Sequence, residues 1–376
     1  MATKFISDFL PHSKMREWLN HSRPLARTFL SSAQCEGPDL PTLLQMALPE
    51  HRKRFENLAL CQYANSQGDI ELRQTIANFY PGLGAENIVT FAGAQEALTC
   101  AFFALATNQM EVVTTTPCFP PLHLVPTAVA AKITQVPLLD GPFGWALDLP
   151  RFLNSIKSGL IVLNFPHNPT GHIISRAELD AIIACAQTLD CAILSDEVFS
   201  GLDFSEASAA LAPVASLYVK GVSIGTVSKS LGLSGVRIGW LASQDVQFVE
   251  RVLKVKSYCS ICTGVSDEIL ALIALTNHRQ IQNDLMQTIK SNLHNAQALL
   301  LHATKSLSFH APLAGPFVFA KLNSQMTARD LANTALSAGI QILPGDIFGD
   351  YPQHFRLGLG LKNFNEPFAQ LLRLIS

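Results

Sequence analysis

The stretch Thr226-Val-Ser-Lys-Ser-Leu-Gly-Leu-Ser-Gly-Val-Arg237-Ile-Gly-Trp240 places one lysine, Lys229, among small hydroxyl and glycine residues. Glycines let a large group approach the backbone, while the hydroxyl groups and Arg237 suit a phosphate. A partly buried lysine with a lowered pKa is a nucleophile that forms Schiff bases. Together these residues favour a site for a phosphorylated aldehyde, and pyridoxal 5′-phosphate (PLP) is the biological one. The alternative is a glycine-rich loop with a lysine at the surface.

Short apolar runs alternate with helical patterns over the chain that leads up to this stretch. The runs are rich in β-branched residues and cover residues 87–91, 111–116, 132–137, 159–164, 191–195 and 221–225. Between them, Asp69 is placed to cap one helix, and Ser175 and Glu178 form a capping box for another. This alternation predicts an α/β fold with a mostly parallel sheet that helices cover on both faces.

The pattern changes after about residue 245. Long helical patterns are followed by a strand-like run over 316–321, a helix beginning at Thr327 and a strand-like run over 355–360. We therefore expect a large PLP-binding domain over 41–255. Linking helices and a smaller C-terminal α/β domain would occupy 256–376, and residues 1–40 would form an N-terminal arm that packs on the small domain.

Four groups of candidate residues follow predicted strands. Ligands of parallel α/β sheets bind at the carboxyl ends of the strands, so we expect these groups to converge. Gly93, Ala94 and Gln95 open a helix, where backbone N–H groups and the helix dipole can hold a phosphate. Prolines around Phe119 would fix its ring over a flat cofactor, although a core phenylalanine in a proline-rich turn fits residues 116–121 equally well.

The other two groups carry an amide and a carboxylate. In Asn164-Phe-Pro-His-Asn-Pro-Thr-Gly171, two X-Pro steps make a rigid turn that would hold the Asn168 amide at a fixed angle to a phenolic oxygen. Asp196 ends an apolar run, and a buried carboxylate needs a partner such as a protonated pyridine nitrogen. A plain loop and a helix N-cap are the alternatives. We interpret His167 as structural, because nothing pairs it with a second histidine or a carboxylate, and we expect no metal site.

In this order and spacing the motifs resemble those of the fold-type-I, class I and II PLP-dependent aminotransferases. Asp196 follows Asn168 by 28 residues (196 − 168), and Lys229 follows Asp196 by 33 (229 − 196). Tyr63 looks like the family's dimer-crossing tyrosine, and residues 344–349 and 355–357 look like its C-terminal signatures. The resemblance covers nearly the whole chain. It implies a seven-stranded type of sheet, a homodimer, and a transferase that moves an amino group from an L-amino acid to a 2-oxo acid.

The resemblance implies a role for each candidate residue. Lys229 would form the Schiff base with PLP and shuttle the proton, and Asp196 would pair with the pyridine nitrogen. Arg356 would clamp the substrate α-carboxylate, with Asn168 and Gly37 also at the substrate. Considered alone, Arg356 could equally be a surface arginine on an edge strand. The residues implied to hold the cofactor are Gly93, Ala94, Gln95, Phe119, Asn168, Asp196, Phe199, Thr226, Ser228, Lys229, Arg237 and, from a second subunit, Tyr63.

Phe199 departs from the family pattern, which usually has a tyrosine three residues after the aspartate. That hydroxyl normally donates to the phenolic oxygen of the cofactor, so we expect the Schiff base of this protein to stay protonated to a higher pH. The departure also leaves open another PLP-dependent reaction of an amino acid, catalysed by a β-lyase, cyclase or oxidase.

The amino-acid composition bears on the other classes of function that this chain could have. The 376 residues include 48% hydrophobic and 15% charged residues, with a net charge of −2, so neither nucleic-acid binding nor a PLP-sensing regulator with a DNA-binding domain is indicated. Eight scattered cysteines favour core thiols in a reducing compartment. We find no signal peptide and no membrane span, and therefore expect a cytoplasmic enzyme of small molecules.

Overall fold

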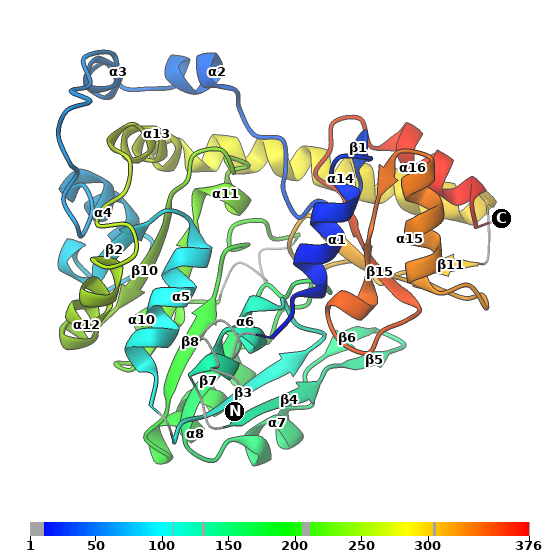
Figure 1. Cartoon of the computed structure of the whole chain (residues 1–376), viewed down its shortest axis with the longest axis horizontal. Coiled ribbons are helices and arrows are strands. Elements are labelled where there is room, and N and C mark those ends of the chain that lie inside the picture. Colours follow the sequence, from blue (N-terminus) through cyan, green and yellow to red (C-terminus); the bar gives the residue numbers. More distant parts are fainter. Residues whose placement is uncertain (1–10, 108, 130–131, 205–210, 304–305, 376) are drawn as a thin grey trace, which may run out of the picture.

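The computed structural model describes residues 11–107, 109–129, 132–204, 211–303 and 306–375. The first ten residues of the predicted arm lie outside this range. The helices are α1 (Lys14–Ser22), α2 (Leu40–Gln45), α3 (Pro49–Glu56), α4 (Ile70–Ala77), α5 (Ala94–Leu105), α6 (Pro121–Leu124), α7 (Leu149–Ser155), α8 (Arg176–Thr188), α10 (Val214–Leu217), α11 (Val227–Ser230), α12 (Val246–Lys256), α13 (Val265–Thr276), α14 (His278–Ala303), α15 (Ala328–Ser337) and α16 (Asn365–Arg373). Figure 1 shows their arrangement.

Seven strands form the large sheet in the order β2-β10-β9-β8-β7-β3-β4. Their bounds are β2 (Ile88–Phe91), β3 (Glu111–Thr116), β4 (Lys132–Pro137), β7 (Gly159–Asn164), β8 (Ala192–Asp196), β9 (Gly221–Thr226) and β10 (Gly239–Ser243). Neighbouring strands from β9 to β4 pair in parallel, whereas β10 is antiparallel to both β2 and β9. The predicted mostly parallel α/β sheet is confirmed. The sequence pattern missed β10.

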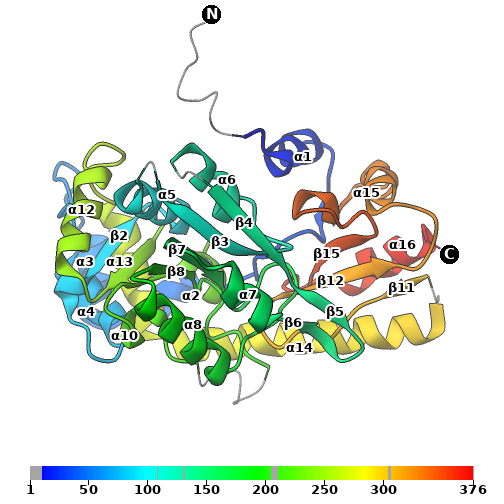
Figure 2. The ribbon, with the colours of Figure 1, turned by 90° about the horizontal axis from the view of Figure 1, so that it is seen from below.

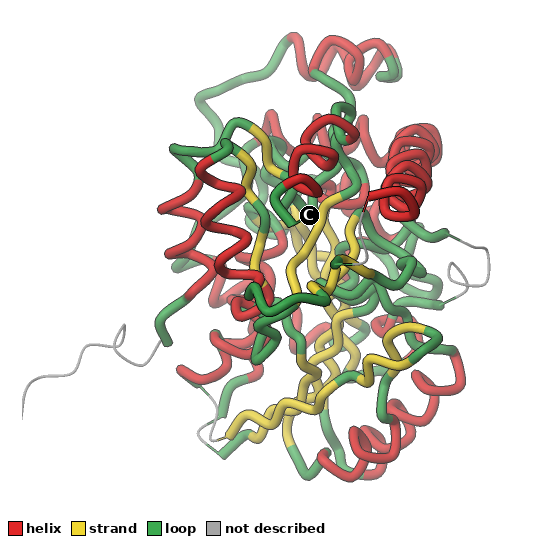
Figure 3. The backbone as a smooth tube through the Cα atoms, turned by 90° about the vertical axis from the view of Figure 1, so that its right-hand side faces the viewer, coloured by secondary structure: helices red, strands yellow, loops and turns green. Residues whose placement is uncertain are grey.

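Strands in the middle of the sheet present alternate residues to two separate cores, as β7 illustrates. In β7, Leu160 and Val162 pack with α5 and α12, whereas Ile161 and Leu163 pack with α8 and α13. A strand turns successive side chains to opposite faces, so apolar residues at every position require cover on both sides. Figure 3 shows helices on both sides of the strands.

The helix ends carry the caps that the sequence predicts. The side chain of Asp69 accepts from the Leu72 N–H at the start of α4. Ser175 and Glu178 form a reciprocal capping box at α8, and Thr327 caps α15. Such caps satisfy N–H groups that have no partner within the helix, and each stabilises its helix by about 1 kcal/mol.

A second sheet lies towards the C-terminus, where Figure 2 shows it beside α14, α15 and α16. Its order is β11-β12-β15-β14, and its strands are β11 (Leu307–Ser308), β12 (Phe317–Leu322), β14 (Leu343–Pro344) and β15 (His354–Gly358). The short strands β5 (Leu139–Gly141) and β6 (Gly144–Ala146) form a hairpin.

The N-terminal segment contacts this C-terminal part. Strand β1 (Thr28–Phe29) pairs in parallel with β13 (Ile340–Gln341), and the indole N–H of Trp18 donates to the Ile342 carbonyl at 2.9 Å. The division of the chain at residues 40 and 255 stays a prediction. Among the described helices, none has the length and apolar character needed to cross a membrane.

Candidate active site

The motifs predicted to converge meet at the carboxyl edge of the large sheet. Asn164 and Asp196 are register partners at the ends of β7 and β8, and the Asn164 amide donates to the Asp196 carbonyl at 3.0 Å. Thr226 ends β9, and Lys229 follows it within α11. Three adjacent parallel strands thus bring an amide, a carboxylate and an amine to one edge.

Asp196 is 3% exposed, and its Oδ1 accepts from the Val198 N–H at 3.3 Å. Burial raises the pKa of the Asp196 carboxyl to about 7, against the opposing effects of that hydrogen bond and of Lys229. A turn follows Asp196, so its carboxylate does not cap a helix at this point. A buried carboxylate of this kind is stabilised by a cation, and Lys229 provides only part of that compensation.

Lys229 is the amine of this group. Burial, together with the charge of Arg356, lowers its pKa to about 8, while Asp196 and Cys35 act in the opposite direction. The neutral amine, which is the nucleophilic form, is therefore more accessible near neutral pH than that of an ordinary lysine. Sequence reasoning missed Cys35, a buried thiol whose pKa burial raises to about 12.

Arg356 lies on β15, between β12 and β14, and is 8% exposed, so it is not an edge-strand surface arginine. Its Nε and Nη2 donate to the Ser31 carbonyl at 3.1 and 2.7 Å, and its Nη1 donates to Asn168 Oδ1 at 2.9 Å. The rings of Phe317 and Phe348 lie 5.6 and 5.5 Å from the guanidinium carbon. Burial lowers the pKa of Arg356 to about 9, which leaves the group charged at neutral pH.

These contacts orient the Asn168 side chain. Its oxygen accepts from Arg356, so its two amide hydrogens remain for another acceptor. Its own backbone N–H donates to Asn164 Oδ1 at 3.0 Å, which holds the loop to the end of β7. His167 beside it contacts Thr115 and Thr170 at 3.3 and 2.8 Å, in keeping with a structural role.

An anion cradle lies at the start of α5. Gly93 has a φ of +92°, and a Cβ at this position would overlap with the Arg237 guanidinium. Arg237 Nη1 also lies 3.5 Å from the hydroxyl oxygen of Ser228, whose backbone N–H donates to Thr226. The first N–H groups of a helix, here those of Ala94 and Gln95, have no partner within the helix. An arginine, a hydroxyl and a helix N-terminus are a donor set that suits a phosphate.

Two aromatic candidates differ in their surroundings. Phe119 is partly buried against the α5-side core, so both the cofactor and the core interpretation remain compatible with its position. Phe199 is 2% exposed, and its ring meets Phe317 edge to face at 4.9 Å. Phe199 therefore packs against a ring that itself lies over Arg356, which the sequence did not indicate.

Two further candidates lie apart from Lys229 along the chain. The backbone of Gly37 packs on the loop after α11, because a Cβ there would lie 2.6 Å from the Leu231 carbonyl oxygen. Tyr63 is 85% exposed, and within the described residues no hydrogen bond or ring contact joins it to Lys229 or Arg237 of its own chain.

The cysteines are not all core thiols, since Cys61 and Cys259 are exposed.

The residues present fit PLP on the chemistry of the donor set. A buried carboxylate, an amine with a lowered pKa and a phosphate cradle correspond to the pyridine nitrogen, the aldehyde and the phosphate of that cofactor. The spare amide hydrogens of Asn168 suit its phenolic oxygen.

Comparison with known proteins finds relatives that match this chain over most of its length. Residues 29–365 match the family described as aminotransferase class I and II. Capreomycidine synthase of Streptomyces vinaceus is 28% identical over 350 residues, which cover 90% of this chain and 87% of the relative. Aspartate aminotransferase of Thermococcus kodakarensis is 26% identical over 348 residues, 92% and 87% of the two chains. A PLP-dependent aminotransferase from Streptococcus suis superposes with a TM-score of 0.88 at 25% identity, covering 97% and 96%.

Proposed function

Because the chain belongs to the class I and II aminotransferases and is a PLP-dependent aminotransferase, we propose that Lys229, Asp196 and Arg356 carry its reaction. The observation that supports this most directly is the lowered pKa of Lys229 beside a buried carboxylate and a buried arginine. The substrates are an L-amino acid and a 2-oxo acid.

When bound, PLP supplies an aldehyde that condenses with amines and an electron-poor ring that stabilises negative charge at the adjoining carbon. Arg237, Ser228, Thr226 and the N–H groups of Ala94 and Gln95 would hold its phosphate. Asp196 would keep a proton on its ring nitrogen, Asn168 would donate to its phenolic oxygen, and Phe119 would cover one face of its ring.

Arg356 binds the substrate. A guanidinium has five N–H donors, and three of those of Arg356 are directed at Ser31 and Asn168. The remaining two suit a carboxylate, which would fix the amino acid with its Cα near Lys229. As a neutral amine, Lys229 Nζ would then take the proton from Cα. As an ammonium, it would return that proton to the cofactor carbon that came from the aldehyde. Gly37, packed on the loop after Lys229, would line the same space.

The test is a single-turnover reaction of the PLP-loaded protein with L-amino acids and no 2-oxo acid. We expect pyridoxamine phosphate and one equivalent of 2-oxo acid. Borohydride reduction followed by peptide mass analysis should place the pyridoxyl group on Lys229, and Lys229→Ala should abolish that label. The exposed Lys254→Ala serves as the matched control. A label on another lysine would refute the assignment.

A second candidate function is a lyase, cyclase or oxidase reaction at the same site. Two observations support it: Phe199 stands where the family usually has tyrosine, and capreomycidine synthase is similar over 90% of this chain. In the same assay this function would regenerate PLP and accumulate no pyridoxamine phosphate.

We also propose a homodimer in which Tyr63 reaches the site of the second copy. Leu60, Tyr63 and Tyr258 are each more than 80% exposed, and the Lys256 ammonium donates to the Ser66 carbonyl, which brings their two segments together. Exposed apolar groups of this kind are typical of interfaces. Light scattering should give twice the chain mass, and Tyr63→Phe should weaken PLP binding without changing that mass. A cytoplasmic location is part of the proposal and is supported by eight unpaired cysteines.

A further inference from the structure

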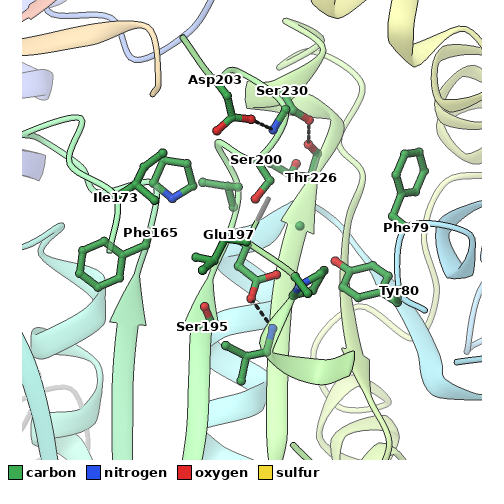
Figure 4. Close-up of a pocket in the computed structure, with 18 of the residues that line it drawn as sticks. Phe79, Tyr80, Phe165, Ile173, Ser195, Glu197, Ser200, Asp203, Thr226 and Ser230 are labelled. Carbon is green, nitrogen blue, oxygen red and sulfur yellow. Dashed lines mark hydrogen bonds between the residues drawn. The ribbon is translucent and has the colours of Figure 1, made fainter. Parts of the chain in front are cut away.

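A cavity of about 330 Å³ lies on the α8 side of the large sheet, opposite to Asp196, and Thr226 at the end of β9 is the one proposed cofactor-binding residue in its described lining (Figure 4). Strand alternation separates the two spaces. Leu194, two residues before Asp196 on β8, packs on the α5 side of the sheet, whereas Ile193 packs on the α8 side. Ser195 and Glu197 line the cavity, and Lys229, Arg356 and Asn168 do not.

The cavity is unbalanced in charge. Its described lining includes the carboxylates of Glu197 and Asp203 and contains neither lysine nor arginine. Burial raises the pKa of the Glu197 carboxyl to about 7 and that of Asp203 to about 6. Burying a carboxylate costs free energy unless a cation or sufficient hydrogen bonds compensate. Both groups would therefore be stabilised by a cation in this space.

The contacts of the two carboxylates leave them accessible from the cavity. Glu197 Oε1 accepts from the Val214 N–H at 3.0 Å and from the Ser223 hydroxyl at 2.8 Å. Asp203 Oδ2 accepts from the Gly201 N–H at 3.2 Å. Although Glu197 lies deep in the protein, its side chain is only partly covered, because the cavity opens onto it. Figure 4 shows both carboxylates among the lining side chains.

The remaining wall is largely apolar and aromatic. Phe79, Tyr80, Phe165 and Trp240 line it, and the Trp240 indole N–H donates to the Tyr80 hydroxyl at 2.8 Å, which fixes two of the rings. Aromatic rings pack on apolar groups and also attract cations over their faces. The volume lies in the range of small-molecule sites.

We propose that this cavity is a second binding site, for a small molecule that carries a cationic amine on an aromatic or apolar body. The inference rests on the cavity and its charge, and does not depend on the reaction at Lys229.

The test uses the PLP-loaded protein and the tertiary amine N,N-dimethyl-2-phenylethylamine, which cannot condense with the cofactor. The neutral 3-phenylpropan-1-ol is the matched probe, because it has no carboxylate for Arg356 to bind. A hydrogen bond to a charged group contributes about 1.5–3 kcal/mol, so we expect the amine to bind at least about tenfold more tightly than the alcohol. Calorimetry gives the affinities, and a crystal soaked with the amine gives its position.

Variants test the two carboxylates and the apolar wall of the cavity separately. Glu197→Gln and Asp203→Asn should each weaken amine binding by about tenfold while the PLP absorbance is kept, and Glu250→Gln at the exposed surface should have no effect. Ile173→Trp should fill the cavity and weaken the binding of amine and alcohol alike, which tests the site even if the Glu197 variant fails to fold. Equal affinity for the amine and the alcohol, an amine located elsewhere, or protein atoms filling this space in the crystal would overturn the proposal.

Discussion

Replacing Arg356 by lysine tests the arrangement of the substrate clamp. Arg356 uses three N–H donors on Ser31 and Asn168, and in the proposed function its other two bind the substrate carboxylate. A lysine keeps the charge but loses the paired geometry. Charge-assisted hydrogen bonds contribute about 1.5–3 kcal/mol each, so losing one of two, with poorer alignment of the other, should cost about 2–3 kcal/mol. That corresponds to a rise in KM of about 30- to 150-fold.

The assay compares steady-state kinetics with an L-amino acid and with the corresponding primary amine that lacks the carboxylate. Because the clamp acts on substrate and transition state alike, we expect the effect in KM with kcat largely kept. The primary amine without a carboxylate should react similarly with the parent protein and with the Arg356→Lys variant. Arg329→Lys, which alters the pair with Asp346 at 2.7 Å, is a matched control in the same part of the chain. A KM within threefold of the parent protein, in a variant that keeps its melting temperature and PLP content, would refute the reasoning.

Three further predictions concern the cofactor residues. Phe199→Tyr should lower, by about one to two units, the pKa obtained from the absorbance of the lysine-bound cofactor, because it adds a donor to the phenolic oxygen; an unchanged titration contradicts this. Asp196 has a folded-state pKa raised from 3.8 to about 7, so the folded apoprotein binds more protons than the unfolded chain between these values and loses stability as the pH rises through them. Asp196→Asn should therefore raise the apoprotein melting temperature at pH 8 and leave it nearly unchanged at pH 3, and equal shifts at both would count against the assignment. Gly93→Ala should displace Arg237 and weaken PLP binding about tenfold or more in a reconstitution titration, whereas Gly235→Ala, with open space around it, should not.

Local sequence signals were sufficient for six of the seven strands of the large sheet and for residues that follow them. Buried parallel strands are continuous apolar runs, and the polar groups at their carboxyl ends must meet because the strands are adjacent. The meeting of Asp196 with the 164–171 loop follows from this argument alone. Strand β10 does not, because Gly239–Ser243 directly continues the glycine-rich stretch and its antiparallel pairing depends on β2, far away in the sequence.

The surroundings of Arg356 could not be predicted, because they arise from long-range contacts. Its two partners lie 325 and 188 positions away, and neither the Ser31 carbonyl nor the Phe317 ring has a sequence pattern that indicates an arginine. The alternative of a surface arginine could be rejected only once the pairing of β15 with two neighbouring strands was known. The cavity at Glu197 could not be predicted either. Its excess of carboxylates depends on the absence of lysine and arginine from its described lining, which the sequence does not reveal.

The hydrogen bonds between Arg356 and the Ser31 carbonyl connect positions 325 residues apart. The carboxylate clamp proposed here therefore needs both segments, and no contiguous fragment that lacks either one can form it. Loss of either segment would remove the aligned clamp even where Lys229 and Asp196 are kept, and it would also remove the contact that orients Asn168.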